Sequence, residues 1–377
     1  MAIVTRYFST TGAGAADGTT WADRAALFSA GNWSSVVTGF AFNSTDALRC
    51  LIGPGSYTCS QTLATGLFAN APTVGNPLWL HSCDNAGAVL APPAPGWTSD
   101  QPAFDDSTLP VIATTTNVAT SSLAAAAWRL LKLTATGRTS GSVIGGAFDV
   151  DWCVITTSAA ASGVLAASAV TNTKNSVLSV TGSQYSAVVI CANGENLWNV
   201  RVIGNSSASS GNRQGVNFGG TTSLTIFDRM TIYGNVGAGW IYGGATAGVQ
   251  CRITRSTIAN NTGSGISLPN TASQTARITV DRCCITGNGA YGIDPGGANT
   301  NLIVTNCRLR DNATANFGTF GNFPTDMGNY TTDSDDATEY VNAASGDYRI
   351  KSSAAIWGKG YGVSDQAASG GVFIIDD

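Results

Sequence analysis

The sequence has very few of the residues that metal centres and nucleophilic active sites need. Its 377 residues contain one histidine, His81, and only two glutamates, Glu195 and Glu339. The nine cysteines are scattered, without the Cys-x-x-Cys spacing of a zinc site. Because zinc centres and Ser-His-Asp triads depend on these residues, we expect neither a metal ion nor a cofactor.

Charge and long apolar runs are scarce as well. Charged residues make up 11% of the chain and the net charge is −4, so no overall field attracts nucleic acid or an anionic membrane. No apolar run reaches the ~18 residues of a membrane span. The first residues, Met-Ala-Ile-Val-Thr-Arg, lack the apolar core of an export signal. We therefore expect no nucleic-acid partner, no membrane partner, and folding in a cytoplasm.

What the chain does contain is a repeat between Asn196 and Gly321. In each copy an aliphatic residue is followed by two residues and then by an asparagine. The five copies are Val202–Asn205, Ile232–Asn235, Ile258–Asn261, Ile285–Asn288 and Leu309–Asn312. Their asparagines are 30, 26, 27 and 24 residues apart, and a period of this length is typical of a solenoid or a propeller.

Apolar and polar residues alternate ahead of each asparagine. This period of two predicts a strand with one buried face. Eight and ten residues before the last four asparagines a second alternating run is shifted in phase, as at Phe227 and Ile253, which indicates a corner. A short third strand follows each Gly-rich turn, as at 215–218 and 265–268. Three strands and three corners in each repeat predict a parallel β-helix, with about ten turns in all.

The repeated asparagines have a structural explanation. Equivalent residues of successive turns lie about 4.8 Å apart, and an asparagine side chain both donates and accepts hydrogen bonds. We therefore favour a vertical ladder of the five asparagines over a ligand site. Cys251, Cys283 and Cys307 occupy inward positions, which predicts small apolar core residues with free thiols, as in a protein folded in a reducing cytosol.

Both ends of the chain carry further patterns. Thr20 begins a Thr-x-x-Asp pattern that predicts a short helix at about 21–29, placed to cap the open N-terminal end. We divide the chain into an N-terminal strand and helical cap (1–45), a β-helix (46–321) and a C-terminal cap or tail (322–377). The tail includes strand-like stretches at Tyr348–Lys351 and Val372–Ile375.

Three segments add a family resemblance. They are Tyr7-Phe-Ser-Thr-Thr-Gly with Asp17-Gly-Thr-Thr-Trp, Ile52-Gly-Pro-Gly-Ser-Tyr-Thr, and the tail from Tyr340 to Gly360. Each resembles the pectate-lyase-like right-handed parallel β-helix repeat proteins, of the kind found in bacteriophage virions. The resemblance implies an all-β, single-stranded right-handed parallel β-helix. Gly370-Gly-Val-Phe-Ile-Ile-Asp-Asp stands where the family has its usual last strand. Because this fold serves lyases, hydrolases, adhesins and phage spikes, the resemblance is specific for the fold rather than for function.

Two pairs of aspartates are weak catalytic candidates, because glycan hydrolysis needs two carboxylates about 5–10 Å apart. Asp228 and Asp281 occupy one position two turns apart, about 9.6 Å. Asp149 and Asp151 share one face of a strand. Asp228 and Asp281 lie at a corner, where aspartate is a common turn residue, so we favour a structural role and no catalysis.

Binding candidates come from arginines and aromatic residues. Arg229, Arg255 and Arg282 form an outward stripe on three successive turns. They are candidates for binding an acidic glycan or a carboxylate-bearing protein surface, although we favour pairing with nearby aspartates and carbonyl groups. Trp240 and Tyr242 are candidates for stacking on sugar rings, with core packing or trimer contacts as the alternatives.

These observations lead to one expectation and one alternative. We expect a non-enzymatic structural protein of a bacteriophage virion, a capsid decoration, head spike or tail spike, folded in the host cytoplasm. Its partners would be two further copies in a homotrimer and capsid or tail proteins. The alternative is a glycan-binding or glycan-depolymerising tailspike that acts on host surface polysaccharide. A secreted bacterial adhesin is disfavoured because the sequence shows no export signal.

Overall fold

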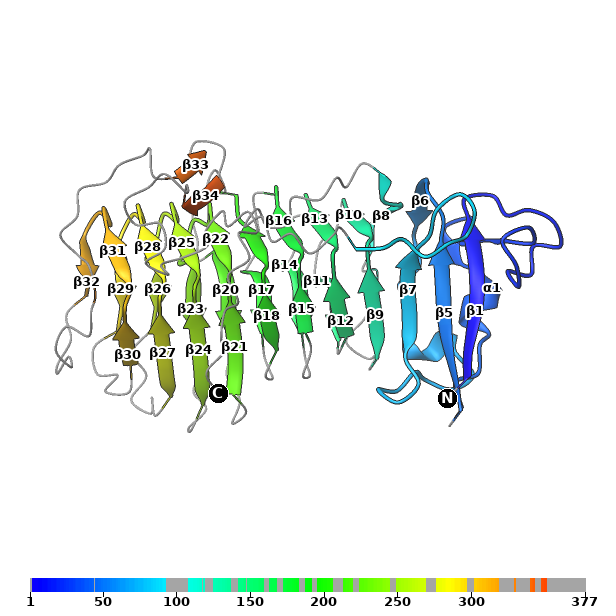
Figure 1. Ribbon diagram of the computed structural model, residues 1–377, viewed down its shortest axis with the longest axis horizontal. Helices are drawn as coiled ribbons and strands as arrows, with labels where there is room; N and C mark the ends of the chain where they lie inside the picture. Colours follow the sequence, from blue (N-terminus) through cyan, green and yellow to red (C-terminus); the bar gives the residue numbers. More distant parts are fainter. Residues whose placement is uncertain are drawn as a thin grey trace, which may run out of the picture.

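The computed structural model is an elongated stack of short strands that follow one another in chain order (Figure 1). It describes residues 2–43, 45–92, 108–116, 118, 125–136, 142–146, 148–158, 163–167, 172–182, 187–191, 195–205, 213–219, 224–244, 249–268, 276–296, 302–318, 329, 340–342 and 347–350.

Three parallel sheets run along the long axis, and we name them sheets A, B and C. Sheet A has twelve strands in the order β2 (Ala25–Ala26), β1 (Ala2–Ser9), β5 (Asp46–Ile52), β7 (Leu78–Ser82), β9 (Ala126–Arg129), β12 (Phe148–Asp151), β15 (Asn172–Lys174), β18 (Asn196–Trp198), β21 (Leu224–Asp228), β24 (Gln250–Thr254), β27 (Arg277–Asp281) and β30 (Leu302–Thr305). Each strand pairs with the equivalent strand of the next turn, as the prediction of a parallel β-helix requires.

Sheets B and C are built in the same way. Sheet B contains β6 (Ser56–Cys59), β8 (Val111–Thr114), β10 (Lys132–Ala135), β13 (Val154–Thr157), β16 (Val177–Val180), β19 (Arg201–Ile203), β22 (Thr231–Tyr233), β25 (Thr257–Ala259), β28 (Cys284–Thr286) and β31 (Arg308–Arg310). Sheet C contains β11 (Ser142–Gly146), β14 (Gly163–Ala167), β17 (Ala187–Cys191), β20 (Gln214–Phe218), β23 (Trp240–Tyr242), β26 (Ile266–Ser267), β29 (Tyr291–Asp294) and β32 (Ala315–Phe317).

One strand from each sheet makes a turn, and the described chain has eight complete turns, from β9–β11 to β30–β32. The expectation of about ten turns was too high, because the turns that begin with β1, β5 and β7 have no described strand in sheet C. Inward side chains from all three sheets form one continuous apolar core, with Phe227, Ile253 and Val280 stacked on successive turns of sheet A. Stacking of equivalent positions explains why a repeat of short strands can bury a core at all.

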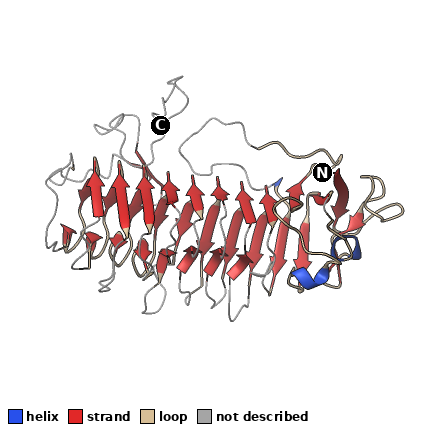
Figure 2. Ribbon diagram, turned by 90° about the horizontal axis from the view of Figure 1, so that it is seen from below, coloured by secondary structure: helices blue, strands red, loops and turns tan. Residues whose placement is uncertain are grey.

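The prediction of a helix at about 21–29 is wrong. Thr20 and Asp23 do bond to each other as a capping pattern would require, but the chain then pairs β2 with β1 and forms the hairpin β3 (Phe28–Ser29) and β4 (Asn32–Trp33). Sheet pairing has overridden the local helix signal. The described N-terminal helices are α1 (Ser35–Thr38), four residues long, and the 3-10 turn η1 (Thr65–Leu67). Figure 2 shows the helical segments at the N-terminal end; that they cap the β-helix stays a prediction.

The tail folds back onto sheet B. Its two described strands, β33 (Tyr340–Asn342) and β34 (Asp347–Ile350), pair antiparallel and lie beside β25. Tyr340 is buried, and its hydroxyl lies 3.2 Å from the thiol of Cys284 on β28. None of the described helices is long and apolar enough to cross a membrane.

Candidate functional site

One residue in each turn has a positive φ angle at the corner between sheets A and B. From β9 onward these residues are Leu130, Trp152, Asn175, Asn199, Arg229, Arg255, Arg282 and Asn306, with φ between 46° and 56°. The predicted arginine stripe therefore occupies a left-handed backbone position. Asparagine tolerates this conformation, whereas an arginine there costs roughly 1–2 kcal/mol. Contacts with neighbouring side chains must therefore offset this conformational cost of the arginines.

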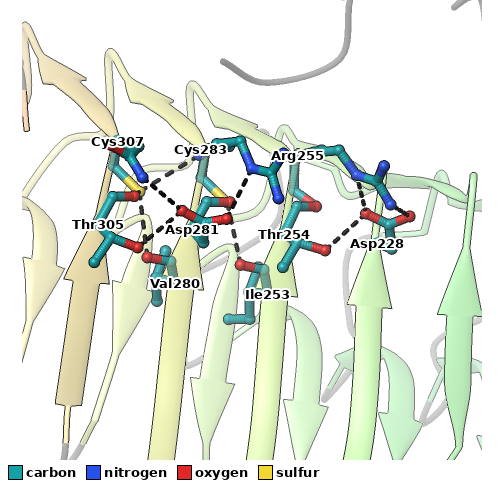
Figure 3. Close-up of polar contacts among 12 residues, drawn as sticks. Asp228, Ile253, Thr254, Arg255, Val280, Asp281, Cys283, Thr305 and Cys307 are labelled. Atoms are coloured by element: carbon teal, nitrogen blue, oxygen red, sulfur yellow. Dashed lines mark hydrogen bonds and ion pairs between the residues drawn. The ribbon is translucent and has the colours of Figure 1, made fainter. Parts of the chain in front are cut away.

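For Arg255, an ion pair with Asp228 offsets the cost of the left-handed backbone conformation. The carboxylate of Asp228 accepts two hydrogen bonds from the guanidinium of Arg255, 2.8 Å from Nε and 2.5 Å from Nη2. It also accepts one from the Thr254 hydroxyl at 2.7 Å. Asp228 is only 4% exposed. Figure 3 shows this carboxylate held between two neighbouring turns, so its oxygens are committed to holding the turns together.

Asp281 does the same two turns further on, in a more open setting. Its carboxylate accepts from Arg282 Nε at 2.8 Å, Thr305 Oγ1 at 2.8 Å and Asn306 Nδ2 at 3.2 Å. Burial by itself would raise the pKa of Asp281, but these three donors outweigh burial and lower that pKa. Asp281 is therefore held in its ionised form, the opposite of what a general acid for glycoside cleavage needs.

The second aspartate pair is also engaged. Asp149 accepts from the backbone and the side-chain amide of Asn172, at 3.3 and 3.4 Å. Asp151 accepts from Asn175 Nδ2 at 2.9 Å and lies 3.8 Å from Arg129 Nε. In both pairs the aspartates join neighbouring turns, which is the structural role favoured for Asp228 and Asp281. Within the described part of the chain no cluster of His, Cys, Asp and Glu is suited to a metal ion.

The third arginine of the stripe, Arg229, contacts an aromatic ring. Its guanidinium lies 5.9 Å from the ring centre of Trp198. Burial, and then the positive charge of Arg255, lower the pKa of Arg229. The three arginines therefore contact side chains of their own chain, in agreement with the structural interpretation.

Of the alternatives for Trp240 and Tyr242, the structure supports core packing and contradicts stacking on sugar rings. Trp240 is 0% exposed and Tyr242 is 1% exposed. Both pack in the core against Phe218, with ring centres 5.8 and 5.9 Å away. The sequence left the phase of this short strand open, and the register places Trp240 and Tyr242 inward and Ile241 outward.

Four of the five asparagines form a hydrogen-bonded ladder after sheet B. The side-chain amides of Asn235, Asn261 and Asn288 donate to the next asparagine up to Asn312, at 2.8, 3.0 and 2.9 Å. Asn205 instead donates to the carbonyl of Thr181 on the preceding turn. Glycines at the start of the sheet C strands make room for the ladder. A Cβ atom on Gly265 would lie 2.9 Å from Asn288 Nδ2 and 2.7 Å from the carbonyl oxygen of Gly292.

A column of Ser and Cys residues, directly after the left-handed corner, was missed as a hydrogen-bonding feature. The Ser256 hydroxyl accepts from the backbone N–H of Met230 at 3.0 Å, and the Cys307 sulfur accepts from Cys283 N–H at 3.4 Å. Cys283 and Cys307 are thus more than small apolar residues. Their recurrence with Ser256 at one position was the available signal. In the described residues all nine cysteines are buried and none forms a disulfide.

The outward face of sheet A contains a shallow pocket that sequence reasoning also missed. The pocket measures about 100 Å³ and is lined by Leu224, Gln250, Arg252, Arg277, Thr279 and Cys251. These residues come from β21, β24 and β27, on three successive turns. Arg252 and Arg277 are exposed, and among the described residues neither has an ion-pair partner. Period-two alternation, applied to the first residues of these strands, would have placed them outward.

Comparisons with known proteins found one family match and one structural similarity. The family model described as right handed beta helix region matches residues 146–323. No curated protein matches the chain. Among solved structures, the chain is similar to the A-module of the mannuronan C-5 epimerase AlgE6 of Azotobacter vinelandii, at 16% identity and a TM-score of 0.47, over 77% of this chain and 79% of that chain. At these values the similarity carries no argument about activity. Residues 146–323 are therefore similar to a right-handed β-helix family, and the strand pairing shows that the described part of the chain is a parallel β-helix.

Proposed function

We propose that the chain is a non-enzymatic structural protein that presents its β-helix on the surface of a bacteriophage particle, as a capsid decoration, head spike or tail spike. The observation that carries the absence of catalysis is the state of the two best candidate carboxylates. Asp228 and Asp281 each bind an arginine and a threonine hydroxyl of their own chain. Breaking those bonds to reach a substrate would cost stability at two corners.

The cysteines support folding inside a cell before display. All nine are buried and form no disulfide in the described residues. Burial raises the pKa of the thiols of Cys59 and Cys153 to about 11 and about 12, so little reactive thiolate is present at neutral pH. A long-lived extracellular protein of this kind more often has disulfides. We propose the host cytoplasm as the place of folding and the virion as the destination.

Assembly is the next part of the proposal. The outer surfaces are built from small polar side chains on flat strands, which suits side-by-side association of copies or docking to a symmetric capsid. We propose a homotrimer or a capsid-bound protein. Light scattering of the purified protein should give three times the mass of one 38.4 kDa chain, or antibodies against it should label purified particles. A stable monomer that associates with no particle would contradict this assignment.

The absence of catalysis has a separate test. Purified protein should release no reducing sugar and no unsaturated product from host capsular polysaccharide, lipopolysaccharide or pectin-like glycans. Asp228→Asn and Asp281→Asn are the variants to include. Turnover that either substitution abolishes would replace the structural proposal by a glycan depolymerase.

Glycan binding without cleavage is the second candidate. It is favoured by the outward face of sheet A, which carries half-buried Trp79 on β7, half-buried Trp198 on β18, and the polar side chains of Asn172 and Asn196 on the strands β15 and β18. Aromatic faces beside amide groups suit sugar rings. A glycan array should detect binding that Trp79→Ala weakens. Trp198 is a less specific probe because Arg229 already contacts its ring.

A further inference from the structure

Two large apolar side chains are exposed side by side on sheet A. Leu224 is 43% exposed and Ile226 is 38% exposed, both on β21. Across the sheet, Leu224 pairs with Gln250 and Gln250 with Arg277, while Ile226 pairs with Arg252. We call these five residues the β21–β27 patch. Within the described ranges the other exposed large hydrophobic residues are Ile3, Val74 and Val89, which lie in separate segments.

The charge of the patch is not balanced by nearby acids. Arg252 and Arg277 have no ion-pair partner among the described residues, whereas Arg255 and Arg282, close by on the same turns, bind Asp228 and Asp281. A guanidinium recognises a carboxylate through paired hydrogen bonds. The patch therefore fits a partner that carries carboxylates next to aliphatic or aromatic side chains.

The chain contains a segment with that chemistry. Residues 372–377 read Val-Phe-Ile-Ile-Asp-Asp, four apolar residues followed by two carboxylates. They follow Gly370 and Gly371 and lie outside the described residues. Charge is rare in this sequence, at 11% of residues, so an apolar run joined to two acids is a distinctive match to an apolar surface flanked by two arginines.

The geometry of the tail brings this segment within reach. The last described strand, β34, lies beside β25, which belongs to the same turn as β24 and Arg252. The 21 residues 351–371 join β34 to the segment. A chain of that length has a maximum reach of about 70 Å. This reach is long enough to pass around one corner of the β-helix, and the covalent connection gives the segment a high effective concentration at the patch.

We propose that residues 372–377 dock on the β21–β27 patch of their own chain, with the apolar residues over Leu224 and Ile226 and with Asp376 and Asp377 binding Arg252 and Arg277. Docking covers the exposed apolar surface and neutralises the two arginines. The inference holds whether or not the chain is a virion protein.

Hydrogen exchange of the full-length chain, read by mass spectrometry on the peptide that contains residues 370–377, tests the docking. The amides of 372–375 should exchange about tenfold more slowly than in a variant with Arg252→Glu and Arg277→Glu. Adding Asp376→Arg and Asp377→Arg to that variant should restore the slow exchange. Lys174→Gln, an exposed cation on the same face outside the patch, is the matched control and should change nothing.

Three results would overturn the proposal. The first is fast exchange of 372–375 in the unaltered chain. The second is equal protection in the unaltered chain and in the Arg252→Glu, Arg277→Glu variant, provided circular dichroism shows that the variant is folded. The third is protection that disappears on dilution, because it would assign the segment to the patch of a second copy rather than its own.

Discussion

The early and late turns of the β-helix make the corner after sheet B in different ways. In the early turns, Thr136, Ser158 and Thr181 follow the sheet B strands, and their backbone N–H groups donate to carbonyls of the preceding turn. In the late turns an asparagine takes this place, and Asn235 N–H donates to the Asn261 side chain of the following turn. The backbone N–H at the late corners therefore depends on a side-chain acceptor, whereas at the early corners it donates to a backbone carbonyl.

The corner between sheets A and B shows a similar contrast. Its left-handed residue is apolar in the early turns, at Leu130 and Trp152, and polar from Asn175 onward. In the late turns Asp228 and Asp281 bind the arginines of this corner. The difference teaches that the fold specifies a backbone conformation at each corner, while several side-chain solutions satisfy it.

In the last described turn, a backbone N–H that would donate to a side chain of the next turn needs a different acceptor. Among the described strands no turn follows that of Cys307, so no equivalent Ser or Cys accepts its backbone N–H. The side chain of Asn329 accepts that N–H at 2.8 Å and donates to the carbonyl of Val304 at 2.9 Å. A residue outside the repeats thus replaces the Ser or Cys of the next turn, as buried N–H groups require a partner.

The largest effect should come from breaking the asparagine ladder in a late turn. Asn261 is 1% exposed, and its side chain accepts from the backbone N–H of Asn235 and donates to Asn288. Asn261→Ala should cost about 3 kcal/mol, because a buried N–H loses its acceptor and a cavity forms. Asn205→Ala, at the half-buried start of the series, should cost about 1 kcal/mol. Melting temperatures at one fixed scan rate compare the two, and equal losses would contradict a special role for the late ladder.

Asp228→Asn and Asp281→Asn, at the corner between sheets A and B, should differ in the stability they lose, because the two sites differ in burial. Asp228→Asn leaves Arg255 facing a neutral group at a site where Asp228 is 4% exposed, and we expect a loss of about 2–3 kcal/mol. Asp281→Asn should cost less than about 1 kcal/mol, since the Arg282 side chain is 51% exposed and solvent screens the pair. Guanidinium unfolding of both variants measures the difference. A larger loss at Asp281 would contradict the ranking.

Much of the fold of the late turns was predictable from the sequence, because the same residue types recur at the same positions of each turn. The aliphatic residues three before each asparagine, from Val202 to Leu309, do lie in register on successive strands of sheet B. Asparagine marked this corner because its amide bonds to its own equivalents. The early turns offered no such signal, since backbone hydrogen bonds leave the residue type unconstrained.

The failures have local physical causes. The strand that holds Trp240 and Tyr242 is three residues long, too short for alternation to show which residues face inward. The Thr20 pattern formed its hydrogen bonds, but pairing with β1 extended the chain that follows. The sequence could not show that Arg252 and Arg277 lack an ion-pair partner in the described residues. That follows only from the structure, in which the nearby Asp228 and Asp281 bind Arg255 and Arg282.

A smaller effect is expected in the Ser and Cys column. Ser256→Ala removes the acceptor of the Met230 N–H, and leaving this buried group unpaired should cost about 1–2 kcal/mol. Ser256→Cys should recover most of that loss, because Cys307 accepts the equivalent N–H of Cys283 through sulfur. Unfolding of both variants in guanidinium gives the comparison. If Cys were as harmful as Ala, sulfur could not be assigned a hydrogen-bonding role in the late turns.

The smallest effect concerns pH, and it separates the two halves again. In the early turns His81 lies near Arg129 and Arg49, and burial, followed by these charges, lowers the pKa of His81 to about 4. The folded chain then binds fewer protons than the unfolded chain, whose histidine has a pKa of 6.5, so this region loses stability as pH falls from about 6.5 to about 4. In the late turns the lowered pKa of Asp281 contributes stability that is present above 3.8 and is lost only as pH falls through the folded pKa. The two losses therefore occur in successive pH ranges.

His81 is the only histidine, so its ring proton signal reports one titration in an NMR spectrum. Arg129→Gln should raise the pKa of His81 by about 0.5, because one nearby positive charge is removed, while Arg282→Gln, far along the helix, should leave that titration unchanged. A midpoint near 6.5 in the unaltered chain would show that His81 is open to water, and the contrast between the halves would then rest on their corners alone.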